Sequence, residues 1–417
     1  MEKSGKFRLT SLERNWILYD VGNSAFVLMV ATLIPIFFNA LAAAGGLSSV
    51  EYLAYWGYAS SAVTVITAVL SPILGTVADT KGFKKPIFIL CVFVGIVGCC
   101  AMGAASAWLP FLVIFVIAKV GFSGSLVFYD SMLSDVTTPE RMDEVSSRGY
   151  AWGYIGSCVP FVVCLGLVLG AGSIGISQMM ALNLALLLTA AWWLLTTLPL
   201  LKSYKQLYYV EVEKHAVRQS FARIGHTLRH LPEDKQVFWF LLAFFCYIDG
   251  VYTIIDMATA YGTALGLDTT GLLLALLVTQ IVAFPSALIF GRLSNKYPSA
   301  KLIPVCIAAY AGIAVFAFFL TQQWQFWVLA VIVGMFQGGV QALSRSHFAK
   351  IIPPEKSGEY FGLFDICGKG ASFLGTMIVS VGSQLTGSAN VGVGSLIVLF
   401  IVGFVLFRVS CRQGETA

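Results

Sequence analysis

Charged residues are scarce in this chain of 417 residues. Lys, Arg, Asp and Glu make up 11% of it, whereas 58% of the residues are hydrophobic and the mean hydropathy is +0.83. A soluble domain carries about 25% charged residues. Because this chain has less than half of that share, water cannot be its only solvent. Its length would fit about three soluble domains, but its composition predicts one membrane unit with several spans.

Motifs for metal binding and catalysis are also missing. The nine cysteines lie mostly in apolar segments and show no CxxC or Cys/His spacing, so we expect small buried side chains rather than metal ligands or disulfides. No G-x-S-x-G or H-E-x-x-H occurs, and "GLFDICGKG" lacks the spacing and the hydroxyl residue of a phosphate loop. We therefore expect no catalytic residues, no metal and no cofactor. An integral-membrane enzyme or a receptor is the alternative of another class.

Apolar stretches recur along the whole chain. The hydrocarbon core of a bilayer, about 30 Å thick, needs about 20 apolar residues per helix. Breaks at glycine, proline and charged residues give twelve candidate spans. They lie near residues 15–41, 52–77, 86–106, 109–134, 148–171, 177–199, 236–263, 269–290, 301–320, 325–346, 359–385 and 391–409. The sequence therefore predicts an all-α integral membrane protein with twelve transmembrane helices.

Lysine and arginine are absent from six alternate loops, although the chain holds 26 of them. Basic residues stay on the cytoplasmic side of membrane proteins, so we expect both termini in the cytoplasm. Residues 1–14 lack the apolar core of a signal peptide and are expected to be a cytoplasmic tail, as are residues 410–417. The short loops and the lack of a glycosylation sequon favour a bacterial inner membrane.

The longest polar stretch, residues 200–235, separates the sixth span from the seventh. It carries seven of the lysines and arginines and three of the four histidines. We interpret it as a linker with an amphipathic helix on the inner leaflet; a regulatory or nucleic-acid-binding role is the alternative. Six spans, a linker and six spans are typical of a duplicated transporter. We expect bundles at 15–199 and 236–409, a monomer in the lipid bilayer, and no nucleic-acid partner.

A weak internal repeat supports the duplication. "GTVADTKGFKKP" follows the second span, and "GRLSNKYPSAK" follows the eighth span, at the same place in the second half. Gly75 then aligns with Gly291, and Asp79 aligns with Asn295. The basic Lys84 and Lys85 align with Lys301, but the second copy has lost the acidic residue, so the repeat is degraded.

Four stretches resemble a known family. "GTVADTKGFKK" resembles the signature of the major facilitator superfamily. "WILYDVGNSAF", "FYDSMLSDVT" and "GMFQGGVQALSRSHFAKIIP…GEYFGLFDICGKG" are similar to its vacuole effluxer-like branch. The resemblance covers most of the chain and implies the major facilitator fold, two six-helix bundles, and secondary transport. Eukaryotic relatives of this branch export amino acids from the vacuole.

Two lysines lie deep inside predicted spans. Lys119 lies about 11 residues past Trp108 and Lys369 about 10 past Glu359, which places both roughly 15 Å deep at 1.5 Å per residue. An unpaired charge at that depth costs about 2.5–3.5 kcal/mol or more. Each lysine should therefore face a partner or water.

Other polar residues repeat at helical spacing within the spans. The resemblance implies that spans one, four, seven and ten surround a central cavity, so these residues become candidates for substrate binding or coupling. The candidates are Asp20, Asn23, Lys119, Asp130, Asp249, Asp256, Gln337, Gln341, Asp365 and Lys369. Asp365 and Lys369 are four residues apart and can pair on one helix face. The alternative is that such pairs only lock helices together.

Three further residues are candidates for a gate at the cytoplasmic end: Asp79, Lys84 and Arg345. The carboxylate of Asp79 would accept hydrogen bonds from a helix N-terminus, such as the one near Gly358. For Arg345 we weigh a gate against a purely structural ion pair.

The sequence thus predicts a secondary active transporter that moves a small polar solute by alternating access. An amino acid or a carboxylate-bearing metabolite would suit these charges, with Lys119 or Lys369 on its carboxylate and Asp20 or Asp249 on its amine. Proton coupling through Asp20, Asp130 or Asp249 is expected. Sugars, nucleosides and drug-like compounds are the alternative substrates.

Overall fold

The computed structural model describes residues 7–211, 225–227 and 229–415, with only the backbone described at 49–50, 53, 259–260, 263–264, 269–270, 273 and 369–373. Helices dominate this part of the chain. Those of the first half are α1 (Ser11–Ala31), α2 (Leu33–Ala44), α3 (Ser49–Ala78), α4 (Lys84–Gly103), α5 (Trp108–Ser131), α6 (Leu133–Val136), α7 (Met142–Leu169) and α8 (Gln178–Ser203). Those of the second half are α10 (Lys235–Ala264), α11 (Thr269–Leu293), α12 (Ser299–Phe318), α13 (Gln323–Ile351), α14 (Ser357–Thr386), α15 (Ala389–Gly394) and α16 (Ile397–Glu415). Two short 3-10 turns, Leu231–Glu233 and Pro354–Lys356, complete them.

The predicted spans correspond to these helices. Within the described residues, eleven helical stretches are long and apolar enough to cross a membrane, and the first of them runs through α1 and α2 as Ser11–Ala44. The remaining predicted span, 359–385, is helix α14, which is thirty residues long and carries three charged residues in its first half. Thirty residues span about 45 Å, so α14 also has the length to cross a bilayer.

Local sequence signals fix where several helices begin. At α1 the Thr10 hydroxyl accepts the Glu13 N–H at 3.2 Å, and the Glu13 carboxylate accepts the Thr10 N–H at 2.7 Å. Ser48 and Glu51 form the same reciprocal pair at the start of α3. Such capping boxes satisfy backbone donors that a helix leaves unpaired at its first turn.

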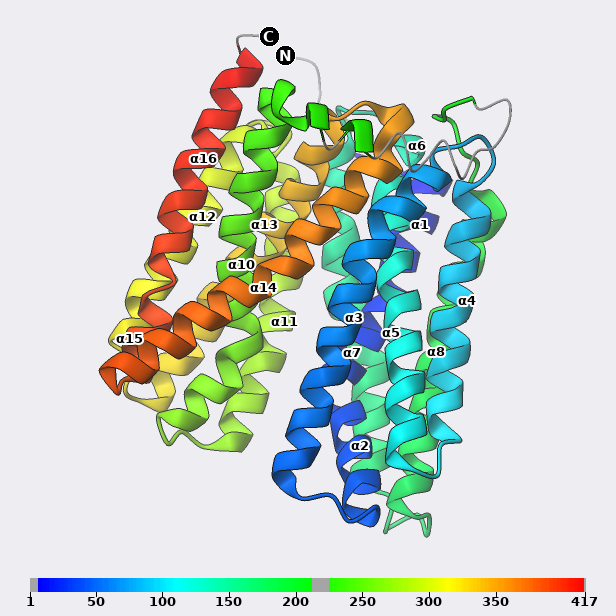
Figure 1. Ribbon diagram of the computed structural model, residues 1–417, viewed down its shortest axis with the longest axis vertical. Helices are drawn as coiled ribbons and strands as arrows, with labels where there is room; N and C mark the ends of the chain where they lie inside the picture. Colours follow the sequence, from blue (N-terminus) through cyan, green and yellow to red (C-terminus); the bar gives the residue numbers. More distant parts are fainter. Residues whose placement is uncertain (1–6, 212–224, 228, 416–417) are drawn as a thin grey trace.

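The helices form two groups, α1–α8 and α10–α16. Figure 1 shows the groups side by side at the end of the molecule where both termini lie, and diverging towards the other end. We call these the termini end and the far end. The described parts of the linker that joins the groups, residues 204–211 and 229–234, lie at the termini end (Figure 1). The predicted surface helix of this linker falls mostly on residues 212–224 and 228, which lie outside the described part of the chain.

Close backbone approach joins the groups at the two copies of the repeat. A Cβ atom on Gly75, near the end of α3, would collide with the carbonyl of Gly358 at the start of α14. A Cβ atom on Gly291, near the end of α11, would lie 2.8 Å from the Cβ of Ser147 in α7. Both glycines therefore permit a contact between the groups that a larger residue would prevent, and the degraded repeat has a structural counterpart.

Candidate functional site

A polar cavity of about 360 Å³ lies between the two groups of helices. Helices α1, α5 and α7 line it from the first group, and α10, α11, α13 and α14 line it from the second. We call it the central cavity. The predicted residues that line it are Asp20, Asn23, Asp130, Asp256, Gln337, Gln341, Arg345 and Asp365. These polar residues therefore face a shared void.

The carboxylate of Asp20, in the apolar first helix, thus faces the central cavity. Asp20 is only 7% exposed, yet it lines the central cavity with Asn23 and Ser24, one turn further along α1. Gly149 in α7 makes this placement possible, because a Cβ atom there would lie 3.0 Å from the Asp20 carboxylate. The cost of burying the charge falls because the Arg345 guanidinium lies 3.7 Å from the carboxylate.

Two candidates, Asp249 and Lys119, do not line the central cavity in the described structure. The Asp249 carboxylate is fully buried within the second group, where it accepts the Gly375 N–H at 2.8 and 2.9 Å and the Thr253 hydroxyl at 3.2 Å. This contact ties α10 to α14. Lys119 lies behind the cavity wall, with its ammonium 4.7 Å from the centre of the Phe122 ring and close enough to Asp256 for electrostatic attraction. The Lys369 side chain lies outside the described residues.

Arg345 connects the two groups at the base of the central cavity. Its guanidinium donates to Asp130 at 3.0 Å and to Ser146 at 2.9 and 3.0 Å, and it lies 3.7 Å from the Asp20 carboxylate. The same guanidinium lies over the Trp16 ring, 4.7 Å from its centre. Arg345 comes from α13, whereas these partners come from α1, α5 and α7. The side chain is therefore an ionic bridge between the groups.

Several polar atoms of the cavity wall have no hydrogen-bond partner among the described residues. These buried atoms are Asp20 Oδ2, Asn23 Nδ2, Tyr129 Oη, Gln280 Oε1 and Gln337 Oε1. Buried polar groups in folded proteins are nearly always paired, and leaving one unpaired costs about 1–3 kcal/mol. Five such atoms around one cavity, three acceptors, one amide donor and one hydroxyl, indicate a polar ligand.

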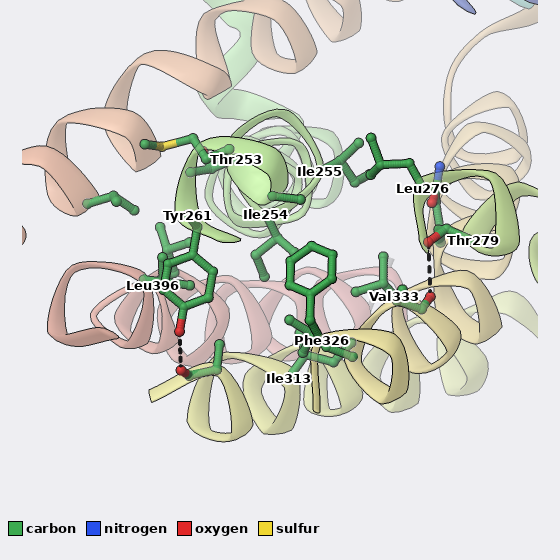
Figure 2. Close-up of a pocket in the computed structure, with 18 of the residues that line it drawn as sticks. Thr253, Ile254, Ile255, Tyr261, Leu276, Thr279, Ile313, Phe326, Val333 and Leu396 are labelled. Atoms are coloured by element: carbon green, nitrogen blue, oxygen red, sulfur yellow. Dashed lines mark hydrogen bonds between the residues drawn. The ribbon is translucent and has the colours of Figure 1, made fainter. Parts of the chain in front are cut away.

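An apolar pocket of about 60 Å³ adjoins the central cavity inside the second group of helices. Figure 2 shows aliphatic and aromatic side chains converging on it from several helices, among them Ile254, Phe326 and Leu396. Figure 2 also shows that the hydroxyls at its rim are already engaged, because Tyr261 donates to the Ala317 carbonyl and Thr279 to the Ala330 carbonyl. We call it the aliphatic pocket.

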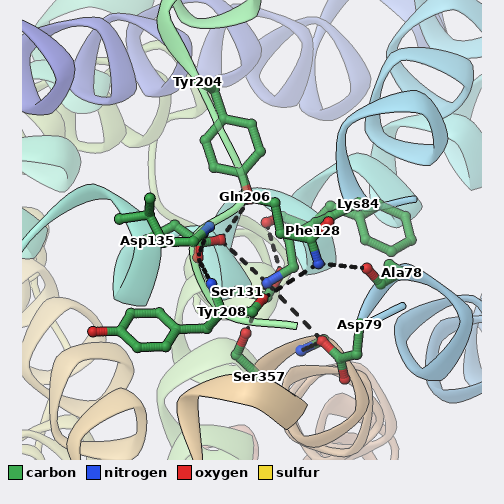
Figure 3. Close-up of polar contacts among 12 residues, drawn as sticks. Ala78, Asp79, Lys84, Phe128, Ser131, Asp135, Tyr204, Gln206, Tyr208 and Ser357 are labelled. Carbon is green, nitrogen blue, oxygen red and sulfur yellow. Dashed lines mark hydrogen bonds and ion pairs between the residues drawn. The ribbon is translucent and has the colours of Figure 1, made fainter. Parts of the chain in front are cut away.

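The termini end is closed by contacts from the repeat motif. The Asp79 carboxylate accepts the Gly358 N–H at 2.7 Å and the Glu359 N–H at 2.8 Å, which is the contact predicted from the sequence. Lys84 is fully buried beside it and donates to Ser357 at 2.9 Å and to Asp135 at 3.3 Å (Figure 3). Carboxylates are favoured at helix N-termini, so the end of α3 holds the start of α14.

The second copy of the repeat makes a simpler version of this contact. Asn295, which takes the place of Asp79, donates from its amide to the Glu144 carboxylate at 2.9 Å, in the first turn of α7. Lys350 and Ser346 of α13 both contact Asp143 next to it, at 2.6 Å each. The two groups therefore meet twice at the termini end, through α3 with α14 and through α11 and α13 with α7.

The first residues of the linker form hydrogen bonds with Asp135 at the termini end. The Asp135 carboxylate accepts the Tyr204 hydroxyl at 2.5 Å and the Leu207 and Tyr208 N–H groups at 3.0 and 2.9 Å (Figure 3). At the surface, Lys81 contacts Tyr209 and Glu211, and hydrogen bonds to these residues raise the pKa of Lys81. The linker therefore shares Asp135 with Lys84.

Some residues of the site carried no usable sequence signal. Gln280 stands alone in the apolar run of α11, without a polar partner one turn away, and Tyr150 and Tyr252 look like ordinary core residues, yet all three line the central cavity. A single amide in an apolar span was the one available hint for Gln280, because such residues rarely face lipid. The contact of Asp135 with the linker depends on the three-dimensional arrangement alone.

Comparison with known proteins identifies the family. The model of the vacuole effluxer Atg22-like family matches residues 11–142 and 134–416. The chain belongs to this family. A protein of Bacillus subtilis named as an uncharacterized MFS-type transporter, YxiO, is 42% identical over 414 residues, which are 98% of this chain and 97% of that one. Autophagy-related protein 22 of Coccidioides immitis is 25% identical over 315 residues, 65% of this chain and 51% of the fungal protein.

Solved structures give the fold. The human organic anion transporter MFSD10 superposes with a TM-score of 0.72 at 14% identity, covering 95% of this chain and 98% of the other. The transporter FucP, in its outward conformation, superposes with a TM-score of 0.71 at 16% identity, covering 96% and 97%. This Atg22-like chain therefore has the predicted major facilitator fold, and it is an integral membrane transporter rather than an enzyme.

Proposed function

We propose that this Atg22-like chain is a secondary active transporter that moves a small polar solute by alternating access. The observation that carries the proposal is the set of polar atoms around the central cavity that lack a hydrogen-bond partner among the described residues: Asp20 Oδ2, Asn23 Nδ2, Tyr129 Oη, Gln280 Oε1 and Gln337 Oε1. They lie between two groups of helices that meet at one end and diverge at the other. A site at the junction of two bundles is what a rocking mechanism needs.

The termini end faces the cytoplasm in this proposal. Lysine and arginine are absent from the loops at the far end, and basic loops stay in the cytoplasm. The arrangement would then be closed to the cytoplasm by Asp79, Lys84 and Arg345, with the central cavity directed outward. The YxiO protein comes from a bacterium, which supports a bacterial inner membrane as the location.

The substrate that suits the central cavity carries an ammonium group. Among the residues whose side chains are described, four carboxylates line the cavity with one guanidinium, and Arg345 is already bound to Asp130 and Ser146. An amino acid fits this distribution, with its amine directed to Asp20 or Asp256. The family description names a vacuole effluxer. Sugars, nucleosides and drug-like compounds remain the alternative classes.

Proton coupling would act through the bridge at Arg345. Asp130 and Asp20 belong to the first group of helices, and Arg345 belongs to the second. Adding a proton to Asp130 would remove one charge of the bridge and weaken the hold between the groups at the termini end. A proton taken up from one side would thus favour opening to the other. Asp249, which is bound to Gly375 inside the second group, has no such role here.

The test is a ligand screen followed by a transport assay. Thermal-shift measurements on the purified full chain against amino acids, organic acids, sugars and nucleosides should identify compounds that stabilise it, because ligands that bind the native state raise its stability. A stabilising amino acid should then show counterflow in liposomes. Stabilisation by sugars or nucleosides alone would contradict the substrate class, and stabilisation without counterflow would contradict transport.

A further inference from the structure

We propose that the aliphatic pocket is a second part of the substrate site. A short aliphatic chain of the solute enters the pocket, while a hydrogen-bond donor at the head of that chain is held by the amide oxygens of Gln280 and Gln337. This inference rests on the proposed transport function and adds the chemistry of the solute: an ammonium group, or another N–H or O–H donor, joined to a chain of a few carbon atoms.

The pocket and the central cavity adjoin. Ile255, Gln280 and Gln337 line both of them. A solute that binds at this shared wall would place its polar head in the central cavity and its apolar tail in the pocket. The remaining lining of the pocket comes from α10 to α16, so the tail would lie wholly within the second group of helices.

The two amide oxygens are the polar atoms left for a ligand at this junction. Gln337 is only 4% exposed, and neither its Oε1 atom nor that of Gln280 has a partner among the described residues. The pocket hydroxyls are already used, because Thr253 donates to Asp249, Thr279 to Ala275 and Ala330, and Tyr261 to Ala317. The junction therefore offers two acceptor oxygens without a donor among the described residues, and a donor on the ligand would pair them.

Charge favours a cationic donor over a neutral one. Asp256 follows Ile255 directly in α10 and lines the central cavity beside the junction. Asp365 lines the same cavity and accepts the Ser71 hydroxyl at 2.8 Å. Lys119 attracts Asp256 from behind the wall but does not line the cavity. An ammonium at the junction would therefore meet acceptors and carboxylates on the cavity side.

The size of the pocket limits the chain. A cavity of about 150 Å³ lined by apolar side chains takes up benzene, and a water needs about 10–15 Å³. A pocket of about 60 Å³ therefore holds roughly two to four carbon atoms and excludes an aromatic ring. Each methylene that enters it should tighten binding about fourfold, because burying one CH₂ contributes about 0.8 kcal/mol.

The experiment measures the affinity of the purified full chain for two homologous series. One series is the straight-chain primary amines from methylamine to hexylamine. The other is the α-amino acids from glycine through alanine, 2-aminobutyrate and norvaline to norleucine, with phenylalanine as the oversized member. Affinity should rise about fourfold per carbon, stop rising after roughly two to four carbons, and fall for phenylalanine. Binding by the amino-acid series alone would show that the head also needs a carboxylate, and the pocket proposal would stand.

Variants separate the pocket from the head group. Ala330→Leu fills the pocket with about three carbon atoms and should remove the dependence on chain length. Ala308→Leu adds the same group on an exposed face of α12 and should keep that dependence. Gln280→Met removes one of the unpaired oxygens and should weaken binding about tenfold or more at every chain length, since hydrogen bonds to charged groups are the stronger ones.

Each outcome decides between the two proposals. Flat affinity along both series, or equal behaviour of Ala330→Leu and Ala308→Leu, would overturn the pocket proposal and leave an amine-transporting cavity in place. Failure of both series to bind, with binding of sugars or organic acids instead, would overturn the proposed substrate class as well. A rise with chain length that Ala330→Leu abolishes and Ala308→Leu preserves is the expected result.

Discussion

Asp79 at the end of α3 holds Gly358 at the start of α14: its carboxylate accepts the Gly358 N–H at 2.7 Å, and the neighbouring Glu359 N–H lies 2.8 Å from the second oxygen. One side chain thereby pairs two backbone donors that a helix cannot pair by itself. The two residues are 279 positions apart and belong to different groups of helices. The bond therefore reports directly on whether the termini end is closed.

Asp79→Asn should open the termini end. An amide offers one acceptor oxygen where the carboxylate offers two, and it loses the charge that favours a helix N-terminus. Losing one charge-assisted hydrogen bond of about 1.5–3 kcal/mol should reduce the ratio of closed to open molecules roughly tenfold or more. Spin labels at the exposed positions Phe83 and Glu355, one in each group, should show a longer distance.

The matched control for this variant is Asp268→Asn. Asp268 also accepts a helix N-terminal N–H, that of Gly271 at 2.7 Å, but it lies at the far end within the second group. The distance between the spin labels should stay unchanged in this control. Equal distances in Asp79→Asn and the unsubstituted chain would show that Asp79 does not hold the gate.

Gly75→Ala should prevent closure by sterics alone. A methyl group at Gly75 would occupy the place of the Gly358 carbonyl, whereas one at Gly57 in the same helix meets nothing within 4 Å. Gly75→Ala should therefore slow transport strongly, while Gly57→Ala should transport at the original rate and gain about 1 kcal/mol of helix propensity. Initial rates in liposomes at matched protein content compare the two, and similar rates would refute the close approach.

Arg345→Lys should destabilise the protein despite keeping the charge. A lysine lacks the planar fork that lets the guanidinium reach Asp130 and Ser146 together, and breaking a buried ion pair costs about 3–5 kcal/mol. Asp130→Asn should cost less after Arg345→Lys than in the original chain, because the two residues share one interaction. Melting temperatures of the single and double variants measure this coupling.

Arg148→Lys supplies the comparison for Arg345→Lys. Arg148 pairs with Glu144 on the same helix at 2.5 Å, and its side chain is 25% exposed, whereas that of Arg345 is 2% exposed. Because solvent screens exposed charges, the melting temperature should fall less in Arg148→Lys than in Arg345→Lys. Additive losses for Arg345→Lys and Asp130→Asn, or an equal loss in Arg148→Lys, would contradict the bridge between the groups.

Lys119→Ala should abolish transport and leave expression intact. The ammonium lies near Asp256 and over the Phe122 ring, so its removal takes away a cation that attracts Asp256 and changes the charge of the site. Uptake or counterflow in liposomes, measured beside the amount of protein in the membrane, checks this. Transport at the original rate would show that Lys119 is only structural.

Much of the fold and part of the site could be predicted because lipid restricts sequences strongly. A span must be apolar over about 20 residues, so the polar residues that remain inside spans stand out, and Asp20, Asn23, Asp130 and Gln337 do line the central cavity. The spacing of residues in one helix could indicate which of them share a face, but not how far that helix is rotated within the bundle.

Asp249 illustrates the limit. By type and spacing it resembles Asp256, seven residues later in α10, but only Asp256 lines the cavity. The difference lies in α14, where Gly375 leaves room for the Asp249 carboxylate, since a Cβ atom there would lie 2.6 Å from Asp249 Oδ1. Packing between two helices decided the role of this residue, and no pattern within one helix could predict it.

The most direct measurement of alternating access is the reactivity of one cavity residue from each side of the membrane. Val27 lines the central cavity and is 43% exposed, so a cysteine can replace it in a chain freed of its nine native cysteines. A membrane-impermeant thiol reagent should react with it from outside in the original background and from the cytoplasm when Gly75→Ala is added. Equal reaction from both sides at once, or reaction only with a lipid-soluble reagent, would contradict a cavity that opens to one side at a time.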